Sequence, residues 1–123
     1  MFSWTEYRPF KQGLQTVLSP LESEVMDIMW KEKRATARHI YNRLKLKHSI
    51  NRTTVNATMN ALAKHGLLGN KISKGRGGLK YIYYVRCSRS KFSRQVVDKV
   101  LDSLFEAYGR TTKKCMRAKL KRV

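Results

Sequence analysis

The sequence predicts an α+β fold, mainly α: a winged helix-turn-helix of three helices and a β-hairpin wing, followed by a C-terminal dimerisation helix. Three observations predict it. Apolar residues recur with helical spacing in successive segments between residues 18 and 66. The pattern then changes to two runs of β-branched and aromatic residues around GRGG. Finally, the spacing between the second and third helices is that of a helix-turn-helix.

The first helix has a clear start signal. Ser19 is placed to cap it, Pro20 suits its first position, and Glu22 completes a capping box three residues after the cap. The sequence KEKR closes the helix. Its apolar stripe consists of Leu21, Val25, Ile28, Met29 and Trp30.

The next two helices follow with short breaks. Thr36 is expected to cap the second helix, which continues to about Lys47. Asn51 is expected to cap the third, and Gly66 supplies the permissive backbone that ends it. After Gly66, LLGNKISK and LKYIYYVR are predicted to form the two strands of the wing.

The chain therefore divides into four predicted parts. Residues 1–17 form an irregular aromatic arm, residues 18–87 the winged-helix DNA-binding domain, residues 88–109 the dimerisation helix and residues 110–123 a basic tail. The arm carries Phe2, Trp4, Tyr7, Phe10 and Val17 without a clear period. Gly109 is expected to stop the last helix, and the tail to be mobile or helical only on a partner.

The composition is that of a folded, strongly basic protein. Lys and Arg number 27 against 8 Asp and Glu, the net charge is +19, and 41% of residues are hydrophobic. Such a charge favours association with any polyanion, so nucleic acid is the first partner to consider, although charge alone does not distinguish DNA from RNA or a membrane. The sequence has neither a run of about 20 apolar residues nor the pattern of a signal peptide, so we expect a cytoplasmic protein.

The third helix has an unusual outward face. At about 100° per residue, Val55, Thr58, Met59 and Leu62 fall on the core side. The opposite side carries Thr53, Asn56, Ala57, Asn60 and Lys64. Asn and Thr contribute little to helix stability, but their short side chains let a helix approach base edges in a major groove. An ordinary solvated surface is the alternative interpretation.

The basic residues near this helix are expected to bind phosphates and fix the register without reading bases. They are Arg52, Lys64, Lys71, Lys74, Arg76 and Lys80. Arg76, at the glycine-rich wing tip, is equally well interpreted as entering a minor groove or as solvated. For Tyr81, Tyr83 and Tyr84, core packing is favoured over base stacking.

The last helix predicts a homodimer. Its apolar stripe is wider than a small domain can easily cover, and a twofold partner would bury it. The stripe consists of Val97, Val100, Leu101, Leu104, Phe105 and Tyr108. Two recognition helices would then face half-sites of a palindrome about one helical turn apart. The alternative is a monomer whose last helix folds back on the first.

The sequence contains no pattern of catalytic or metal-binding residues, so it predicts neither an enzyme nor a cofactor. His39, His48 and His65 lie on separate predicted elements, and GRGG resembles a phosphate-binding loop only superficially. Cys87 and Cys115 lack the spacing of a zinc or redox motif. Two free thiols are favoured, and a disulfide between them stays open.

Four segments, LSPLESEVMDIMW, ATARHIYNRL, NRTTVNATMNALAKHGLL and YIYYV, resemble the penicillinase-repressor (BlaI/MecI-type) family of winged-helix transcription factors over about residues 18 to 86. The resemblance implies a homodimeric repressor whose third helix reads a palindrome. By position, it implies base and nearby phosphate contacts at Thr53, Thr54, Asn56 and Ala57.

The sequence also departs from that family. One helix and a basic tail stand where members typically have several C-terminal dimerisation helices. There is no counterpart of the segment that a sensor protease cleaves, nor of the cysteine-rich motif of the copper-responsive relatives. No inducer or small-molecule effector is therefore inherited. A non-specific architectural or packaging protein is the second hypothesis, since +19 exceeds what two half-sites need.

Overall fold

The computed structural model describes residues 6–123 and separates them into two compact units, one ending at Arg89 and one spanning Ser90–Val123. Phe2 and Trp4 of the predicted arm lie outside the described residues. The elements, in chain order, are η1 (Gly13–Thr16), α1 (Pro20–Glu32), β1 (Arg34–Thr36), α2 (Ala37–Leu44), α3 (Arg52–Lys64), β2 (Leu68–Gly75), β3 (Gly78–Val85) and α4 (Arg89–Arg122).

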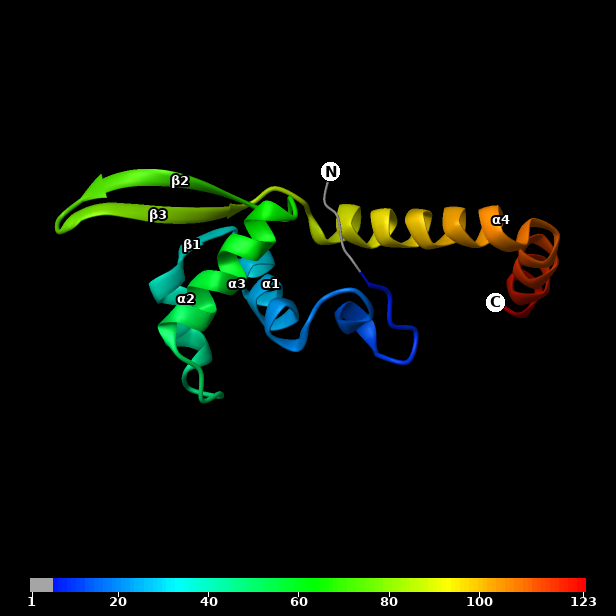
Figure 1. The fold of residues 1–123 in the computed structure, drawn as a ribbon, viewed down its shortest axis with the longest axis horizontal. Helices are drawn as coiled ribbons and strands as arrows, with labels where there is room; N and C mark the ends of the chain where they lie inside the picture. Colours follow the sequence, from blue (N-terminus) through cyan, green and yellow to red (C-terminus); the bar gives the residue numbers. More distant parts are fainter. Residues whose placement is uncertain (1–5) are drawn as a thin grey trace. The chain divides into compact units, whose positions relative to one another are not determined.

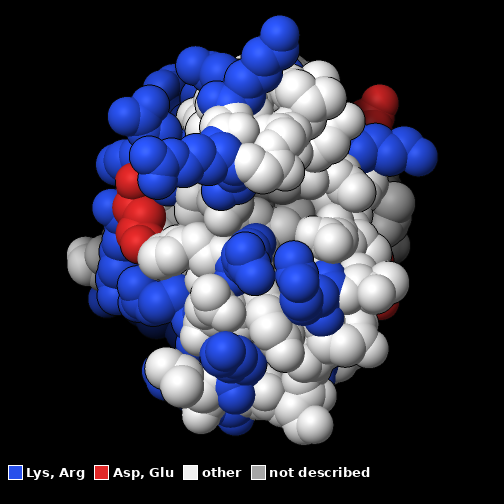
Figure 2. All heavy atoms as spheres, turned by 90° about the vertical axis from the view of Figure 1, so that its left-hand side faces the viewer, with Lys and Arg blue, Asp and Glu red and all other residues white. Residues whose placement is uncertain are grey.

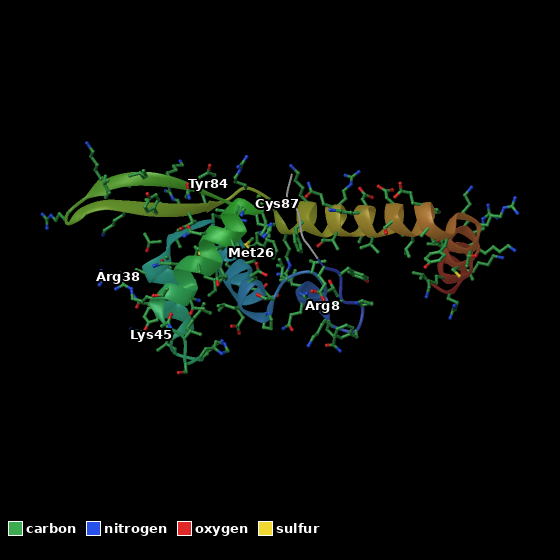
Figure 3. The ribbon with its side chains drawn as sticks, viewed as in Figure 1. Arg8, Met26, Arg38, Lys45, Tyr84 and Cys87 are labelled. Atoms are coloured by element: carbon green, nitrogen blue, oxygen red, sulfur yellow. The ribbon has the colours of Figure 1, made fainter. Side chains whose placement is uncertain are left out.

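The arm before α1 is more ordered than the sequence suggests. Residues 13–16 form the short 3₁₀ helix η1, and the Arg8 guanidinium donates to the carbonyls of Gln15 and Leu18 at 3.1 and 2.9 Å. Figure 3 shows Arg8 beside this turn. Val17 and Leu18 are buried, so the end of the arm belongs to the core of the first unit.

Helix α1 begins with the predicted capping box. The Ser19 hydroxyl accepts from the Glu22 amide at 3.2 Å, and the Glu22 carboxylate accepts from the Ser19 amide at 2.9 Å. The helix ends at Lys33, whose φ of 72° lies in the left-handed region that L-residues rarely adopt. This conformation turns the chain out of the helix and directly into strand β1.

Helices α2 and α3 have the predicted caps. The Thr36 hydroxyl accepts from the His39 amide at 3.1 Å, and the Asn51 side chain accepts from the Thr54 amide at 2.8 Å. Helix α2 ends at Leu44, three residues before the expected Lys47. Beyond Leu44 the backbone forms turn hydrogen bonds, with Lys47 and His48 both donating to the Leu44 carbonyl.

The wing is part of a three-stranded antiparallel sheet in the order β1-β3-β2. The predicted hairpin is confirmed: β2 and β3 pair from Leu68↔Val85 to Gly75↔Gly78. Strand β1 was not predicted, and it pairs with the other edge of β3 from Arg34↔Tyr84 to Thr36↔Ile82. Figure 1 shows the hairpin extending past the helices of the first unit.

The core of the first unit lies between the three helices and the base of the sheet. Met26, Met29, Ile40, Val55, Met59 and Leu62 are fully buried, and Figure 3 shows Met26 pointing into the helical core. Trp30 ties the helices to the exit of the hairpin, because its indole N–H donates to the Cys87 carbonyl at 2.9 Å. The predicted apolar stripe is confirmed at Val25, Met29 and Trp30, whereas Leu21 and Ile28 are only half-buried.

The second unit is the long helix α4 with a break. Tyr108 has non-helical angles (φ −137°, ψ 36°), one residue before Gly109, where the helix was expected to stop. The chain does not remain irregular there, because residues after the break are helical to Arg122. The Thr112 hydroxyl lies near the carbonyls of Leu104 and Tyr108, at 3.0 and 3.1 Å, and satisfies groups that the break exposes.

Candidate nucleic-acid interface

The outward face of α3 is exposed along its length. Val55, Met59 and Leu62 are fully buried, while Thr53, Asn56 and Ala57 on the other side are exposed. The neighbouring side chains Arg52, Thr54, Asn60 and Lys64 are exposed as well. A helix of this kind presents small polar groups and methyl groups to whatever lies outside it.

Two of these polar groups already have partners. The Thr54 hydroxyl donates to the Asn51 side-chain oxygen at 2.9 Å and so supports the helix cap. The Asn60 side-chain oxygen accepts a hydrogen bond from the Tyr83 hydroxyl on strand β3, at 2.6 Å. Within residues 6–123, no hydrogen bond or ion pair occupies the side chain of Asn56.

An open groove runs between α3, the start of α2 and the wing. From α3 it is lined by Arg52, Asn56 and Asn60, and from the hairpin by Asn70, Gly77, Leu79, Lys80, Tyr81 and Tyr83. Thr36, Ala37 and Arg38 close its third side. The groove thus brings together four of the residues proposed from the sequence: Arg52, Asn56, Asn60 and Lys80.

The other proposed residues lie outside this groove. Thr53, Thr54 and Ala57 are on the exposed part of α3. Lys64 lines a second hollow together with Arg86 and Tyr84. Lys71, Lys74 and Arg76 are exposed on the hairpin, where the register places Lys71 and Lys74 on opposite faces of the sheet.

The cations of α3 and the hairpin have no acidic partners. Within the described part of the chain, the acidic side chains contact basic residues of other segments instead, among them Arg8, His39, Arg43, His48 and Arg89. Figure 2 shows the face at the hairpin end, where Lys and Arg are spread over an otherwise uncharged surface and acidic atoms appear only at the edges. The candidate interface is therefore a positive surface whose charges are not neutralised by acidic side chains of the described residues.

Two helix N-termini add to this positive potential. The first turns of α2 and α3 contain no acidic residue, although acidic residues are favoured there by the helix dipole. They carry Arg38 and Arg52 instead, and both side chains line the groove. Figure 3 shows Arg38 pointing outward from α2. This arrangement costs helix stability and suits an anionic partner.

Sequence reasoning did not identify Arg38, Asn70 or Tyr83 as residues of the groove. Arg38 follows the Thr36 cap, which was the one signal in the sequence for a basic helix N-terminus. Asn70 and Tyr83 are cross-strand partners, and only the register of the hairpin places them together beside α3. Burial raises the pKa of Tyr83 above its usual 10.0, and the neighbouring Tyr81 adds to the shift.

Other features do not converge on a reactive site. His39 and His48 pair with Glu32 and Glu24 at 2.7 and 2.8 Å. Cys87 is buried, Cys115 is exposed, and neither forms a disulfide in the structure. Among residues 6–123 there is no cluster of His, Cys, Asp and Glu that could hold a metal ion, and no helix long and apolar enough to cross a membrane.

Three helices and a three-stranded sheet, whose β2–β3 hairpin projects beyond the helices, define a winged-helix protein. The exposed face of its third helix lies beside the wing. The family model described as "Penicillinase repressor" matches residues 18–121, and the chain belongs to this family. The chain is therefore a DNA-binding transcriptional regulator and not an enzyme.

Solved structures resemble this chain at low sequence identity. A possible transcriptional regulator from Methanosarcina mazei Go1 shares the fold, with a TM-score of 0.60 at 21% identity, covering 79% of this chain and 78% of that one. A PadR family transcriptional regulator from Eggerthella lenta DSM 2243 has a TM-score of 0.46 at 18% identity, over 71% of this chain and 79% of that one. The search of curated proteins found no match.

Proposed function

We propose that the protein is a cytoplasmic, homodimeric repressor that reads a palindromic operator with α3 in the major groove. The observation that carries this proposal is the exposed face of α3, where Thr53, Asn56 and Ala57 are short, uncharged and free of covering structure. Asn can pair with adenine, and the methyl groups of Thr and Ala can contact the thymine methyl. A protein that only coats nucleic acid gains nothing from such residues.

The surrounding cations act on the phosphate backbone in this proposal. Arg52 and Arg38 stand at two helix N-termini beside the groove, and both carry charge where the dipole already favours an anion. Lys64, Lys71, Lys74, Arg76 and Lys80 extend the positive surface along α3 and the wing. Phosphate contacts of this kind fix the register of the helix and supply affinity that is independent of sequence.

The wing tip approaches the backbone or the adjacent minor groove. Gly77 and Gly78 have φ angles of 95° and 105°, which glycine adopts without steric cost. The tip is consequently thin, and Arg76 is its exposed charged side chain. A thin basic tip is compatible with a narrow groove, whose negative potential attracts arginine.

A second copy of the chain covers the apolar face of α4 in this proposal. Val97, Leu104 and Tyr108 are 54%, 40% and 64% exposed, and Val100, Leu101 and Phe105 are half-buried. Contiguous exposed apolar surface of this kind marks an interaction site in soluble proteins. A twofold partner would bury it and pair two α3 helices on one duplex.

Selection of bound sequences from random duplexes, at moderate salt, tests the proposal. We expect a palindromic motif with half-sites separated by about one helical turn, or roughly 10 base pairs. Recovery of sequences without any shared motif would contradict it and would favour the non-specific packaging protein.

Matched variants then separate base reading from phosphate binding. Asn56→Ala should weaken binding to the selected operator by about 1–3 kcal/mol, because the hydrogen bonds to a base are lost. Binding to random duplexes should be nearly unaffected. Lys74→Ala and Arg76→Ala should instead weaken binding to every sequence and reduce the salt slope by about 1 for each phosphate that is no longer neutralised. Equal losses on operator and random DNA for Asn56→Ala would exclude reading by this residue.

A further inference from the structure

Asn60 differs from Asn56 although both lie on the outward face of α3. The two residues are four positions apart and therefore neighbours on one side of the helix. Asn60 accepts a hydrogen bond of 2.6 Å from the Tyr83 hydroxyl, whereas Asn56 has no such partner among the described residues. The wing thus holds one of the two α3 asparagines that line the groove.

Tyr83 is a rigid support for this hydrogen bond. It is 5% exposed and lies on β3, the central strand, with Ala35 paired on one side and Asn70 on the other. A buried tyrosine hydroxyl requires a hydrogen-bond partner, and here that partner is the Asn60 oxygen. The hydroxyl keeps its proton at neutral pH, since burial raises a pKa that already lies well above 7, and in the structure this proton is donated to the Asn60 oxygen.

The hydrogen bond holds the Asn60 amide with its oxygen toward Tyr83. A side-chain amide has an oxygen that accepts and a nitrogen that carries two donors, and a flip by 180° exchanges them. With the oxygen held at Tyr83, the nitrogen is the end that stays available to a ligand. Asn56 keeps both orientations, so it can still present its oxygen and nitrogen together to an adenine edge.

We propose that Tyr83 is a positioning residue that makes Asn60 a hydrogen-bond donor toward acceptor edges of bases: purine N7, guanine O6 or thymine O4. This inference rests on the proposed function, because it assumes that α3 lies in a major groove. It assigns different tasks to the two asparagines: Asn56 rotates to fit its base, and Asn60 meets the duplex in a preset orientation. Presetting lowers the entropy lost on binding.

A structural role for the same hydrogen bond predicts a different result. If Tyr83 and Asn60 only fasten the wing to α3, removing either one should loosen the wing and weaken all DNA binding, whatever the sequence. Positioning predicts a loss confined to the operator and to the base pair that Asn60 contacts. The two roles are therefore distinguished by specificity and not by stability.

A double-mutant cycle tests the inference, with the duplex selected from random sequence and an unrelated duplex as probes. Tyr83→Phe should weaken operator binding about 3- to 10-fold through loss of the preset orientation and leave the unrelated duplex unchanged. In the Asn60→Ala background, Tyr83→Phe should have no further effect on the operator. Additive losses, or equal losses on both duplexes, would overturn the inference.

Tyr81→Phe provides the matched control. It removes the same hydroxyl from the same strand and the same sheet face, but Tyr81 is 56% exposed and has no hydrogen bond to Asn60. Any effect of Tyr81→Phe should be the same in the native protein and in the Asn60→Ala background, so the two substitutions should be additive. Coupling between Tyr81 and Asn60 as large as that of Tyr83 would show a general effect of the wing and would overturn the inference.

Single-base-pair variants of the operator give a second, independent measurement. At the position where Asn60→Ala loses discrimination, Tyr83→Phe should accept adenine or cytosine better than the native protein does, because the released oxygen can receive their amino groups. Unchanged discrimination at that position would overturn the inference. If the selection yields no motif, the proposed function fails and this inference with it; if Asn56→Ala behaves as expected and the cycle shows no coupling, this inference alone fails.

Discussion

Residues of the wing and α3 are joined by a tyrosine hydroxyl, and this makes stability at alkaline pH depend on Tyr83. Its pKa is raised above 10.0 by burial and, to a smaller extent, by Tyr81. Between pH 10 and the raised pKa, the unfolded chain loses the phenolic proton while the folded chain keeps it. The free energy of unfolding must therefore fall as the pH rises above 10.

We expect Tyr83→Phe to remove this pH dependence. At pH 8 the variant should lose about 1 kcal/mol of stability through the missing hydrogen bond. Above pH 10 its free energy of unfolding should fall less steeply than that of the native protein, so the two should converge. Denaturant unfolding from pH 8 to 11 measures this, and parallel curves would contradict it. Tyr81→Phe removes only the smaller cause of the shift and should keep most of the pH dependence.

Single residues were predicted best where the signal is local. Ser19, Thr36 and Asn51 cap helices as their types and positions indicate, because a cap depends only on the next three residues. The partner of Asn60 could not be predicted in this way. Tyr83 is 23 positions further along the chain, and its contact with α3 depends on the register and twist of a sheet.

Strands β2 and β3 approach each other closely at Gly69, where the Tyr84 ring lies against the backbone. A Cβ at this position would overlap the Tyr84 ring, whereas a Cβ at Gly75 on the same strand would meet nothing within 4 Å. Lys71 also contacts the Tyr84 ring, with its ammonium 5.4 Å from the ring centre. The ring thus packs directly on the β2 backbone.

Gly69→Ala should therefore displace the Tyr84 ring and destabilise the wing. We expect a loss of about 1 kcal/mol, at the low end for overpacking, because a half-buried ring can swing outward. Gly75→Ala should change the free energy of unfolding by less than about 0.5 kcal/mol, as for other open surface positions. Denaturant unfolding of both variants measures the difference, and equal losses would show that contact with Tyr84 is not the cause.

Elements were predicted where periodicity extends over several turns, and missed where pairing partners create them. The three helices and the hairpin follow from apolar spacing and turn residues. Strand β1 has only the residues Arg34, Ala35 and Thr36, and it exists because β3 offers an open edge beside the end of α1. The left-handed turn at Lys33 leads into this strand, and it could not be predicted because the residue in the turn is not a glycine.

The proposed dimer depends on the apolar face of α4. Leu101 lies near the middle of the proposed dimerisation stripe and is half-buried in a single chain. Leu101→Glu should give a monomer, because burying an unpaired carboxylate in an apolar interface costs several kcal/mol. Sedimentation measures the mass. A variant that still sediments as a dimer would refute the placement of the interface.

The dimer and its affinity should change together. A single winged-helix domain binds one half-site, so Leu101→Glu should lose most operator affinity while its helix content stays nearly native. Asp102→Glu, one position along on the exposed side, is the matched control and should remain dimeric. If the monomer bound the full operator as tightly as the dimer, the operator would not be read by a pair of α3 helices.

The excess charge of the whole molecule is concentrated after the break in α4. Residues 110–123 carry seven Lys and Arg and no acidic residue, so they supply +7 of the net charge of +19. The segment is helical to Arg122, so its cations are spread along an ordered element. This charge exceeds what two half-sites need, so we expect the segment to contact DNA without regard to its sequence.

Removal of residues 110–123 should therefore lower the affinity for random duplexes strongly. The ratio of operator affinity to random-duplex affinity should change less. For each phosphate that the tail no longer neutralises, the slope of log K against log salt should become shallower by about 0.9. Replacing the seven cations by Gln keeps the length of the helix and the Thr112 hydrogen bonds, so it separates charge from the loss of structure. Unchanged binding of both variants at low salt would show that this helix faces a partner other than DNA. A loss confined to the truncated form would instead assign the effect to the shortened helix.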